Sequence, residues 1–399
     1  MKPKNILFIM SDDHARQAIT AYKPDFPVQT PGIDRLYENG MRMDRAYCTN
    51  SICAPSRACI MTGTYNHLNG VRLLDDELDG DLNNVAKVLH NHNYQTAIIG
   101  KWHLGTHVGT LPTGFDTCAV LQSGGGQGTY YDPVFQRADG TMFQKKGYVS
   151  DIIHEMSLDF LKHRDPDRPF FLMCHHKAPH RNWIPGPKYE GAYDDIEFPH
   201  PDTFDDDFAT RGSGAKEAIM DVDALGPVDF KMDELPEFSS DEERRDWKFQ
   251  HYMRDYMACI SSVDDSVAGL LDYIEEEGLS EDTLVIYTSD QGFYTGEHGW
   301  FDKRFMYEES HCMPFLIQMP GTIPAKSTSD EMILNIDFPN LFLDYANIDQ
   351  AELGGQGKSF RDIVEGKEGA KGYDAIYYRY WDYPSEHNVY PNFGIRTRT

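Results

Sequence analysis

The chain contains 399 residues, of which 37 are lysine or arginine and 64 are aspartate or glutamate, so its formal net charge is −27 at pH 7. Hydrophobic residues make up 40% of it and aromatic residues 13%, which is enough for a large core and excludes a disordered or fibrous protein. The acidic excess argues against nucleic acids and anionic membranes as partners, because those interfaces depend on lysine and arginine. An anionic substrate would need a local pocket of positive charge.

The chain begins with one short apolar run, residues 5–10, far below the roughly 20 residues that a membrane-spanning helix needs. No export signal is visible, so the printed chain favours the cytoplasm, whereas removal of a signal before residue 1 would place the protein in the periplasm or outside the cell. Seven cysteines in a chain of this length do not predict a disulfide framework. We expect no membrane insertion and leave the compartment open.

Short apolar runs alternate with helical patterns along the chain. Five runs rich in β-branched and aromatic residues predict central strands at 6–10, 96–99, 170–174, 284–288 and 315–319. Apolar spacings of three and four predict helices at 82–90 and 241–277. This alternation predicts an α/β fold with a large, mostly parallel sheet that is flanked by helices.

Two stretches do not fit the alternation. Residues 190–246 are acidic and weakly periodic, and we expect an insertion with solvated carboxylates that wraps the sheet. The glycines of residues 124–128 lack the Lys-Ser/Thr ending of a phosphate-binding loop, so they predict a mobile loop near the pocket.

Ionisable residues follow four of the predicted strands. Asp12 and Asp13 follow the first strand, Lys101 and His103 the second, His180 the third, and Asp290 with Gln291 the fourth. Because ligands bind beyond the carboxyl ends of the strands in an open α/β sheet, we expect these side chains to meet at one edge. The remaining candidates lack such support and are expected to be structural: His14, His67, His176, Arg181 and His387.

Asp12, Asp13, Asp290 and Gln291 together offer three carboxylates and one amide oxygen. Such hard oxygen ligands suit Ca²⁺ or Mg²⁺ rather than zinc. A divalent cation also explains how adjacent carboxylates stay ionised. We therefore predict a site for a divalent cation, Ca²⁺ or Mg²⁺.

The most specific motif is Cys53-Ala54-Pro55-Ser56-Arg57, followed by a small and apolar stretch that ends in Thr62-Gly63. It resembles the signature of the type I sulfatases of the alkaline phosphatase superfamily. Five further stretches carry the same resemblance in family order: 5–13, 100–105, 178–180, 289–292 and 296–303. The resemblance implies an alkaline-phosphatase-like fold and a hydrolase that cleaves sulfate esters.

The resemblance also assigns roles to individual residues. It implies that a formylglycine-generating enzyme converts Cys53 to formylglycine, whose hydrate is the nucleophile. The resemblance implies that the metal is calcium. Its ligands would be Asp12, Asp13, Asp290, Gln291 and an oxygen of the modified Cys53, with Gln291 standing where asparagine is more common. Arg57, Lys101 and Lys303 match residues that contact the formylglycine or the sulfate. His103 matches the base that releases sulfate, His180 matches the proton donor to the leaving alcohol, and His298 is predicted on the substrate side.

Residues 176–183, 198–204 and 377–389 resemble bacterial carbohydrate sulfatases, above all enzymes that act on 6-O-sulfated N-acetylglucosamine. The net charge disfavours long polyanions, so we predict a small sulfated sugar or a short glycosaminoglycan fragment as the substrate. Two alternatives stay open: a phosphodiesterase or phosphonate hydrolase on the same scaffold, and an inactive carbohydrate-binding homologue.

The predicted catalytic domain covers residues 1–370. Residues 371–399 resemble the beginning of a small antiparallel C-terminal subdomain that continues further in relatives, so we expect the printed chain to be truncated within it.

Overall fold

The computed structural model describes residues 2–399 and is built around a mixed ten-stranded sheet. The strand order is β12-β2-β11-β9-β1-β8-β4-β5-β6-β7. These strands are β1 (Asn5–Ser11), β2 (Gly40–Met43), β4 (Gln95–Gly100), β5 (Thr117–Leu121), β6 (Val134–Gln136), β7 (Met142–Gln144), β8 (Phe170–His175), β9 (Thr283–Ser289), β11 (Phe315–Gln318) and β12 (Ser327–Ser329). Two small sheets contain β10 (Cys312–Met313), β3 (Ala46–Tyr47) and β13 (Ile333–Leu334), and β14 (Ala375–Tyr380) with β15 (Asn392–Thr397).

The predicted strands are confirmed to within one residue at each end as β1, β4, β8, β9 and β11. The neighbours β9, β1, β8, β4 and β5 run parallel, whereas β11 pairs antiparallel with β9. Parallel neighbours place their carboxyl ends at the same edge of the sheet. The residues that follow β1, β4, β8 and β9 are therefore brought together at that edge.

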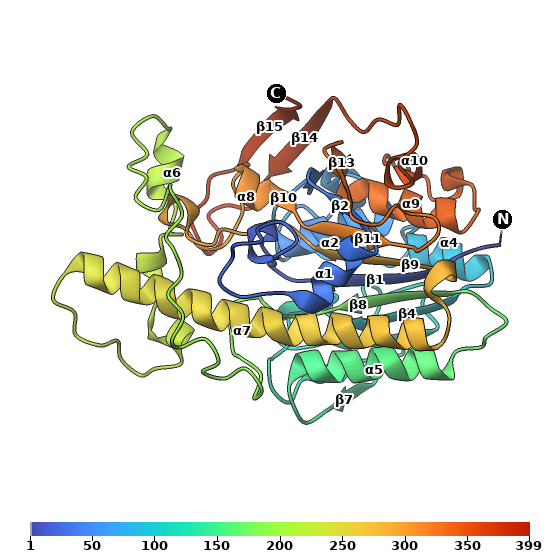
Figure 1. Ribbon diagram of the computed structural model, residues 1–399, viewed down its shortest axis with the longest axis horizontal. Helices are drawn as coiled ribbons and strands as arrows, with labels where there is room; N and C mark the ends of the chain where they lie inside the picture. Colours follow the sequence, from blue (N-terminus) through green and yellow to red (C-terminus); the bar gives the residue numbers. More distant parts are fainter. Residues whose placement is uncertain (1) are drawn as a thin grey trace.

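Helices cover both faces of the sheet (Figure 1). They are α1 (Pro31–Glu38), α2 (Cys53–Thr62), α3 (Asn66–Asn69), α4 (Val85–Asn91), α5 (Val149–His163), α6 (Ser213–Glu217), α7 (Asp241–Glu276), α8 (Glu308–His311), α9 (Phe338–Tyr345) and α10 (Arg361–Val364). The helix predicted at 241–277 is α7, and the one predicted at 82–90 begins three residues later as α4. Across residues 2–399, no helix is long and apolar enough to cross a membrane.

Alternate side chains of β1 enter two different cores. Ile6 and Phe8 pack in the cluster that contains residues of α2, α4 and α9. Leu7 and Ile9 pack in the cluster that contains residues of α1, α5 and α7. A strand that is apolar on both faces is expected in a parallel sheet with helices on each side, so the predicted fold is confirmed.

Helix α2 enters the middle of the molecule rather than lying on its surface. All ten of its residues are buried, so its sequence shows none of the polar face that a surface helix needs. Ile52, in an extended conformation, precedes it, and Gly63 ends it with a left-handed φ of 65°. Cys53 therefore occupies the first turn of a fully buried helix.

The acidic stretch between β8 and α7 is irregular apart from α6 and two 3₁₀ turns. Its last six predicted residues, 241–246, already belong to α7. Ion pairs attach it to α7, because Arg244 contacts Asp223 and Lys231 contacts Asp255. The expectation of solvated carboxylates is wrong for Asp229, which is 2% exposed.

The C-terminal strands β14 and β15 form the predicted antiparallel pair. The Tyr378 hydroxyl donates to the carbonyl of Arg304 and accepts a hydrogen bond from the backbone N–H of Ser51. The hairpin thus holds two loops that lie next to the N-terminus of α2.

Candidate active site

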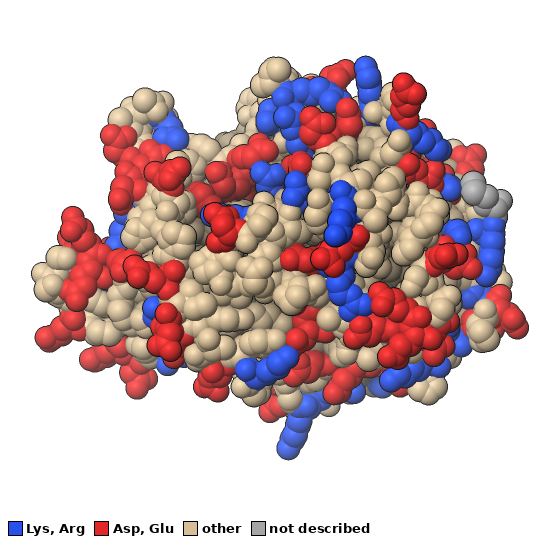
Figure 2. All heavy atoms as spheres, in the orientation of Figure 1, with Lys and Arg blue, Asp and Glu red and all other residues tan. Residues whose placement is uncertain are grey.

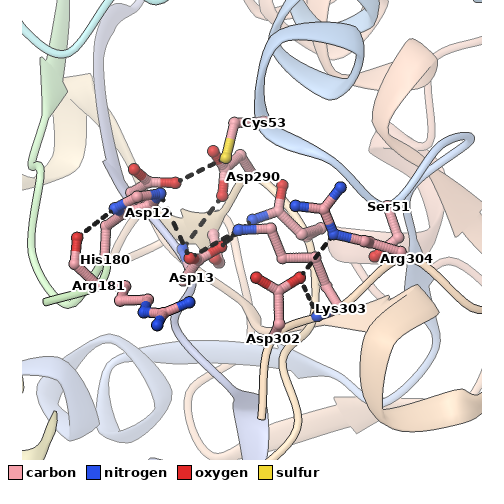
Figure 3. A network of polar contacts seen from close by, with 12 residues as sticks. Asp12, Asp13, Ser51, Cys53, His180, Arg181, Asp290, Asp302, Lys303 and Arg304 are labelled. Carbon is pink, nitrogen blue, oxygen red and sulfur yellow. Dashed lines mark hydrogen bonds and ion pairs between the residues drawn. The ribbon is translucent and has the colours of Figure 1, made fainter. Parts of the chain in front are cut away.

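Five elements deliver the predicted site residues to one place. Asp12 and Asp13 follow β1, Lys101 and His103 follow β4, His180 follows β8, Asp290 and Gln291 follow β9, and α2 supplies Cys53 and Arg57. Lys303 comes from the loop before α8. Figure 3 shows Asp12, Asp13, Cys53, Asp290 and Lys303 pointing toward one another.

The three carboxylates form a compact buried cluster. Oxygen atoms of Asp12, Asp13 and Asp290 lie within 4.8 Å of one another, and none of the three residues is more than 1% exposed. Burial, partly opposed by Lys303, raises the pKa of Asp13 to about 7, and burial together with Asp12 raises that of Asp290 to about 6. Three buried carboxylates this close together are costly unless basic side chains or a metal ion lie beside them.

Each of these carboxylates also contacts one basic side chain, and Figure 3 shows the contact between Asp13 and Lys303. Arg57 Nε lies 2.9 Å from Asp290 Oδ2, Lys101 Nζ contacts Asp12, and Lys303 Nζ lies 2.6 and 2.7 Å from the two oxygens of Asp13. Burial opposes ionisation of Asp12, but Lys101 and the other basic neighbours together outweigh it and hold the pKa well below its usual range. The protein's own charges in this cluster therefore balance one for one.

The Cys53 thiol lies against this cluster. Its Sγ is 3.2 Å from Asp12 Oδ1, and the residue is 1% exposed. Burial raises the pKa of the thiol, and the negative charge of Asp12 adds to the effect. The helix N-terminus would lower that pKa, but burial dominates, so an unmodified Cys53 is a neutral thiol and a poor nucleophile.

The two predicted histidines come from the loops after β4 and β8. Burial lowers the pKa of both His103 and His180 well below the usual value, so both are neutral imidazoles. His180 Nε2 lies 3.9 Å from Asp13 Oδ2, and its Nδ1 lies 2.7 Å from the carbonyl oxygen of Arg181. His103 Nδ1 is buried without a hydrogen-bond partner among residues 2–399.

A cleft of about 420 Å³ opens onto this cluster, and Cys53, His180 and Lys303 contribute to its lining. Gln127 and Gly128 of the glycine-rich loop line it too, as predicted for that loop. The lining also contains residues that were not predicted there: Lys177, Arg181, Asp229, Asp302, Arg304 and His387. Lys177 and Arg181 lie within three residues of His180, and Asp302 and Arg304 flank Lys303. Their proximity to these predicted site residues could have identified them as lining residues from the sequence.

The structure gives the surroundings of three further residues named in the sequence analysis, whose roles stay predictions. Arg181 and His387 were expected to be structural, but both line the cleft, where His387 Nε2 lies 3.2 Å from Asp302 Oδ2. His298 is not among the lining residues. Its Nδ1 lies 2.8 Å from Asp206 Oδ2 and its ring packs against Trp300, because the acidic insertion folds over it.

Several buried polar atoms near Cys53 have no hydrogen-bond partner among residues 2–399. They are Arg57 Nη2, His103 Nδ1, Gln127 Oε1 and Gln291 Oε1. A buried unpaired polar group costs free energy unless a ligand satisfies it. The free carbonyl oxygen of Gln291, beside three carboxylates, fits a hard divalent cation.

The sequence and the fold also match known proteins. The family model described as Sulfatase matches residues 4–348. An N-acetylglucosamine-6-O-sulfatase of Bacteroides thetaiotaomicron is 39% identical, and the alignment covers 100% of this chain and 77% of that protein. The N-acetylglucosamine-6-sulfatase of Bos taurus is 28% identical, and that alignment covers 82% of this chain and 58% of the bovine protein.

A solved structure shows a similar protein in complex with its substrate, D-glucosamine-2-N,6-O-disulfate. It superposes with a TM-score of 0.91 at 38% identity and covers 100% of this chain and 87% of its own. The match extends over the sheet, the cleft and the C-terminal hairpin. This chain therefore belongs to the sulfatase family and is a sulfuric ester hydrolase.

Proposed function

We propose that this protein hydrolyses the 6-O-sulfate ester of a glucosamine unit, as a sulfated monosaccharide or at the end of a short glycosaminoglycan fragment. The observation that carries the proposal is the position of Cys53, which lies beside a balanced cluster of carboxylates and cations and lines a cleft. The names of two relatives and the ligand of the similar solved structure support the choice of sugar. A cleft of about 420 Å³ suits one sugar unit better than an intact chain.

The metal that we propose for this site is Ca²⁺. Asp12, Asp13, Asp290 and Gln291 would hold it, because their oxygens suit a cation that accepts six or more hard ligands. When bound, the cation supplies positive charge that polarises the sulfate group, and formylglycine at position 53 supplies a nucleophilic oxygen.

The chain's own cations would orient and stabilise the sulfate. Arg57 is fixed by Asp290 and by the carbonyl of Lys101, which leaves Nη2 free for an oxygen of the ester. Lys101 and Lys303 sit against Asp12 and Asp13 in a water-poor site, where electrostatic stabilisation of developing negative charge is strong.

We assign proton transfer to His103, His180 and Lys303. His103, neutral and with Nδ1 unpaired, is suited to accept a proton from the nucleophile's second hydroxyl. On the other side, burial opposes the charge of Lys303, but Asp13 and the other negative groups around it together raise its pKa well above the usual value. Lys303 is thus protonated at neutral pH. We place His180, together with Lys303, on the side of the leaving alcohol as the candidate proton donors.

Two measurements test the proposal. Co-expression with a formylglycine-generating enzyme followed by mass spectrometry of the peptide from Ala46 to Arg57 should show a loss of about 18 Da, as expected when a thiol becomes an aldehyde. The modified protein should then release sulfate from N-acetylglucosamine-6-sulfate, with a kcat/KM far above that for the 6-phosphate. A preference for phosphate diesters or phosphonates would favour the alternative hydrolase, and sugar binding without turnover would favour an inactive homologue.

A further inference from the structure

Lys177 is a buried cation whose charge no carboxylate neutralises. Four basic residues line the cleft: Lys177, Arg181, Lys303 and Arg304. Arg181 pairs with Asp229 at 2.6 Å, Lys303 with Asp13 at 2.6 Å and Arg304 with Asp302 at 3.0 Å. For Lys177 the structure of residues 2–399 contains no carboxylate within 4.0 Å and no side-chain hydrogen bond.

The surroundings of Lys177 make this unpaired charge expensive. The residue is 5% exposed, and its Nζ lies 5.1 Å from the centre of the Tyr130 ring. Burial, with Lys101 contributing, lowers the pKa of Lys177 to about 8, so it still carries a proton at neutral pH. A buried ammonium group is retained at such a cost where an anion is to be bound.

The position of Lys177 identifies the anion. Lys177 lines the same cleft as Cys53, His180 and Lys303, the groups that surround the nucleophile. Arg57, Lys101 and Lys303, which we also assign to the sulfate, each pair with one carboxylate of the protein. Among the described lysines and arginines that line the cleft, Lys177 is the one whose positive charge has no carboxylate partner.

We propose that Lys177 binds the sulfate group of the scissile ester, an interaction that rests on the proposed function of this site. Because a sulfate monoester carries one negative charge, it would supply the partner that Lys177 lacks in the protein. The Tyr130 ring, whose hydroxyl donates to the carbonyl of His180, would hold the ammonium group toward the cleft.

The test compares Lys177→Met and Lys177→Arg with the wild type and with Lys188→Met. Lys188 lies in the same connection after β8, but its side chain is 67% exposed and paired with Asp265, so it is the matched control. We expect Lys177→Met to raise KM for N-acetylglucosamine-6-sulfate about tenfold or more, and Lys177→Arg to restore part of the loss. Calorimetry should show that inorganic sulfate binds more weakly to Lys177→Met by a similar factor, with formylglycine content unchanged.

Three outcomes would overturn the inference. KM and sulfate affinity could be unchanged in Lys177→Met, or the wild type could fail to bind sulfate. If KM rises only for an N-sulfated substrate and is unchanged for N-acetylglucosamine-6-sulfate, Lys177 binds a second anionic group of the substrate instead of the scissile sulfate. If the wild type cleaves no sulfate ester, the proposed function fails, but sulfate binding by the two variants still decides the role of Lys177.

Discussion

At the scale of single residues, the site owes its chemistry to burial. A cysteine at a helix N-terminus is usually acidic and reactive, but burial beside Asp12 keeps the thiol of Cys53 protonated. The same burial keeps His103 neutral, which suits a base. The environment that makes an unmodified thiol inert is thus the one in which a formylglycine hydrate has a carboxylate and a base within reach.

Replacing Cys53 by alanine should lower kcat for a sulfate ester about a thousandfold or more, because no other side chain of the cluster can serve as the nucleophile. The measurement is the rate of sulfate release at saturating substrate. The increase of Tm on addition of calcium is measured as well, to check that the variant is folded and keeps its metal site. Cys118→Ala is the control, since Cys118 lies at the start of β5 away from the cleft. Equal loss of activity in both variants would argue against a special role for Cys53.

Removal of the metal should make the stability of the protein depend on pH. In the metal-free protein the pKa values of Asp13 and Asp290 are about 7 and about 6, above the value of 3.8 for an unperturbed aspartate. The folded state therefore binds more protons than the unfolded chain, and this contribution to stability is lost as pH rises through 6 and 7. Calcium should accordingly raise Tm more at pH 7.5 than at pH 5.5.

Thermal unfolding in EDTA and in CaCl₂ across this pH range measures the effect. Asp12→Asn serves as the companion variant, and its Tm should respond weakly to calcium at every pH. A calcium-induced shift that is as large at pH 5.5 as at pH 7.5 would contradict the assignment.

At the scale of elements, the acidic insertion builds one wall of the cleft. Asp229 reaches Arg181 with two hydrogen bonds of 2.6 and 2.8 Å, and the Arg181 guanidinium stacks 5.1 Å from the centre of the Phe301 ring. This bidentate geometry fixes the orientation of the arginine. The insertion therefore contributes to substrate positioning, whereas the catalytic cluster comes from the strand ends.

Asp229→Asn should loosen Arg181 and raise KM for a sugar sulfate about tenfold, because a charged hydrogen bond is worth about 1.5–3 kcal/mol. A small aryl sulfate, which lacks the sugar, should be affected much less. Steady-state kinetics on both substrates measures the difference. Asp205→Asn is the matched control, because Asp205 is 85% exposed and its partner Arg245 is not among the residues that line the cleft. Equal changes on both substrates would place the effect in the catalytic cluster instead.

At the scale of the whole molecule, the net charge is strongly negative, whereas four lysine and arginine side chains line the cleft. Figure 2 shows acidic side chains spread over one face, with many at the end where α7 begins. The net charge of −27 repels a polyanion at long range, whereas the balanced cluster and Lys177 act only inside the cleft. Surface charge thus selects against long substrates before the cleft does.

Salt should therefore speed the hydrolysis of longer substrates. Between 20 and 150 mM NaCl the Debye length falls to about 8 Å, which screens the repulsion of a sulfated hexasaccharide more than that of a monosaccharide sulfate. We expect kcat/KM for the hexasaccharide to rise over this range while that for the monosaccharide sulfate changes little. A decrease for the hexasaccharide would indicate a basic surface that attracts it.

The sequence alone was sufficient for the fold class, for five strands of the large sheet and for the meeting of the predicted site residues at one edge. Strands such as β1 and β9 are short-range patterns, and the polar residues after them follow from the rule that parallel strands end at one edge. The Cys-x-Pro-x-Arg motif places Cys53 and Arg57 one helical turn apart, a spacing that local structure alone determines.

Only the tertiary structure decided how the loops close over that cluster. Three contacts join segments that lie far apart in the chain. Arg181 pairs with Asp229, His387 contacts Asp302 in the cleft, and His298 contacts Asp206 outside the set of lining residues. The unpaired charge of Lys177 becomes visible only when every neighbouring carboxylate has been placed. Local patterns determine which side chains a strand or helix presents, but contacts between loops depend on packing that those patterns do not encode.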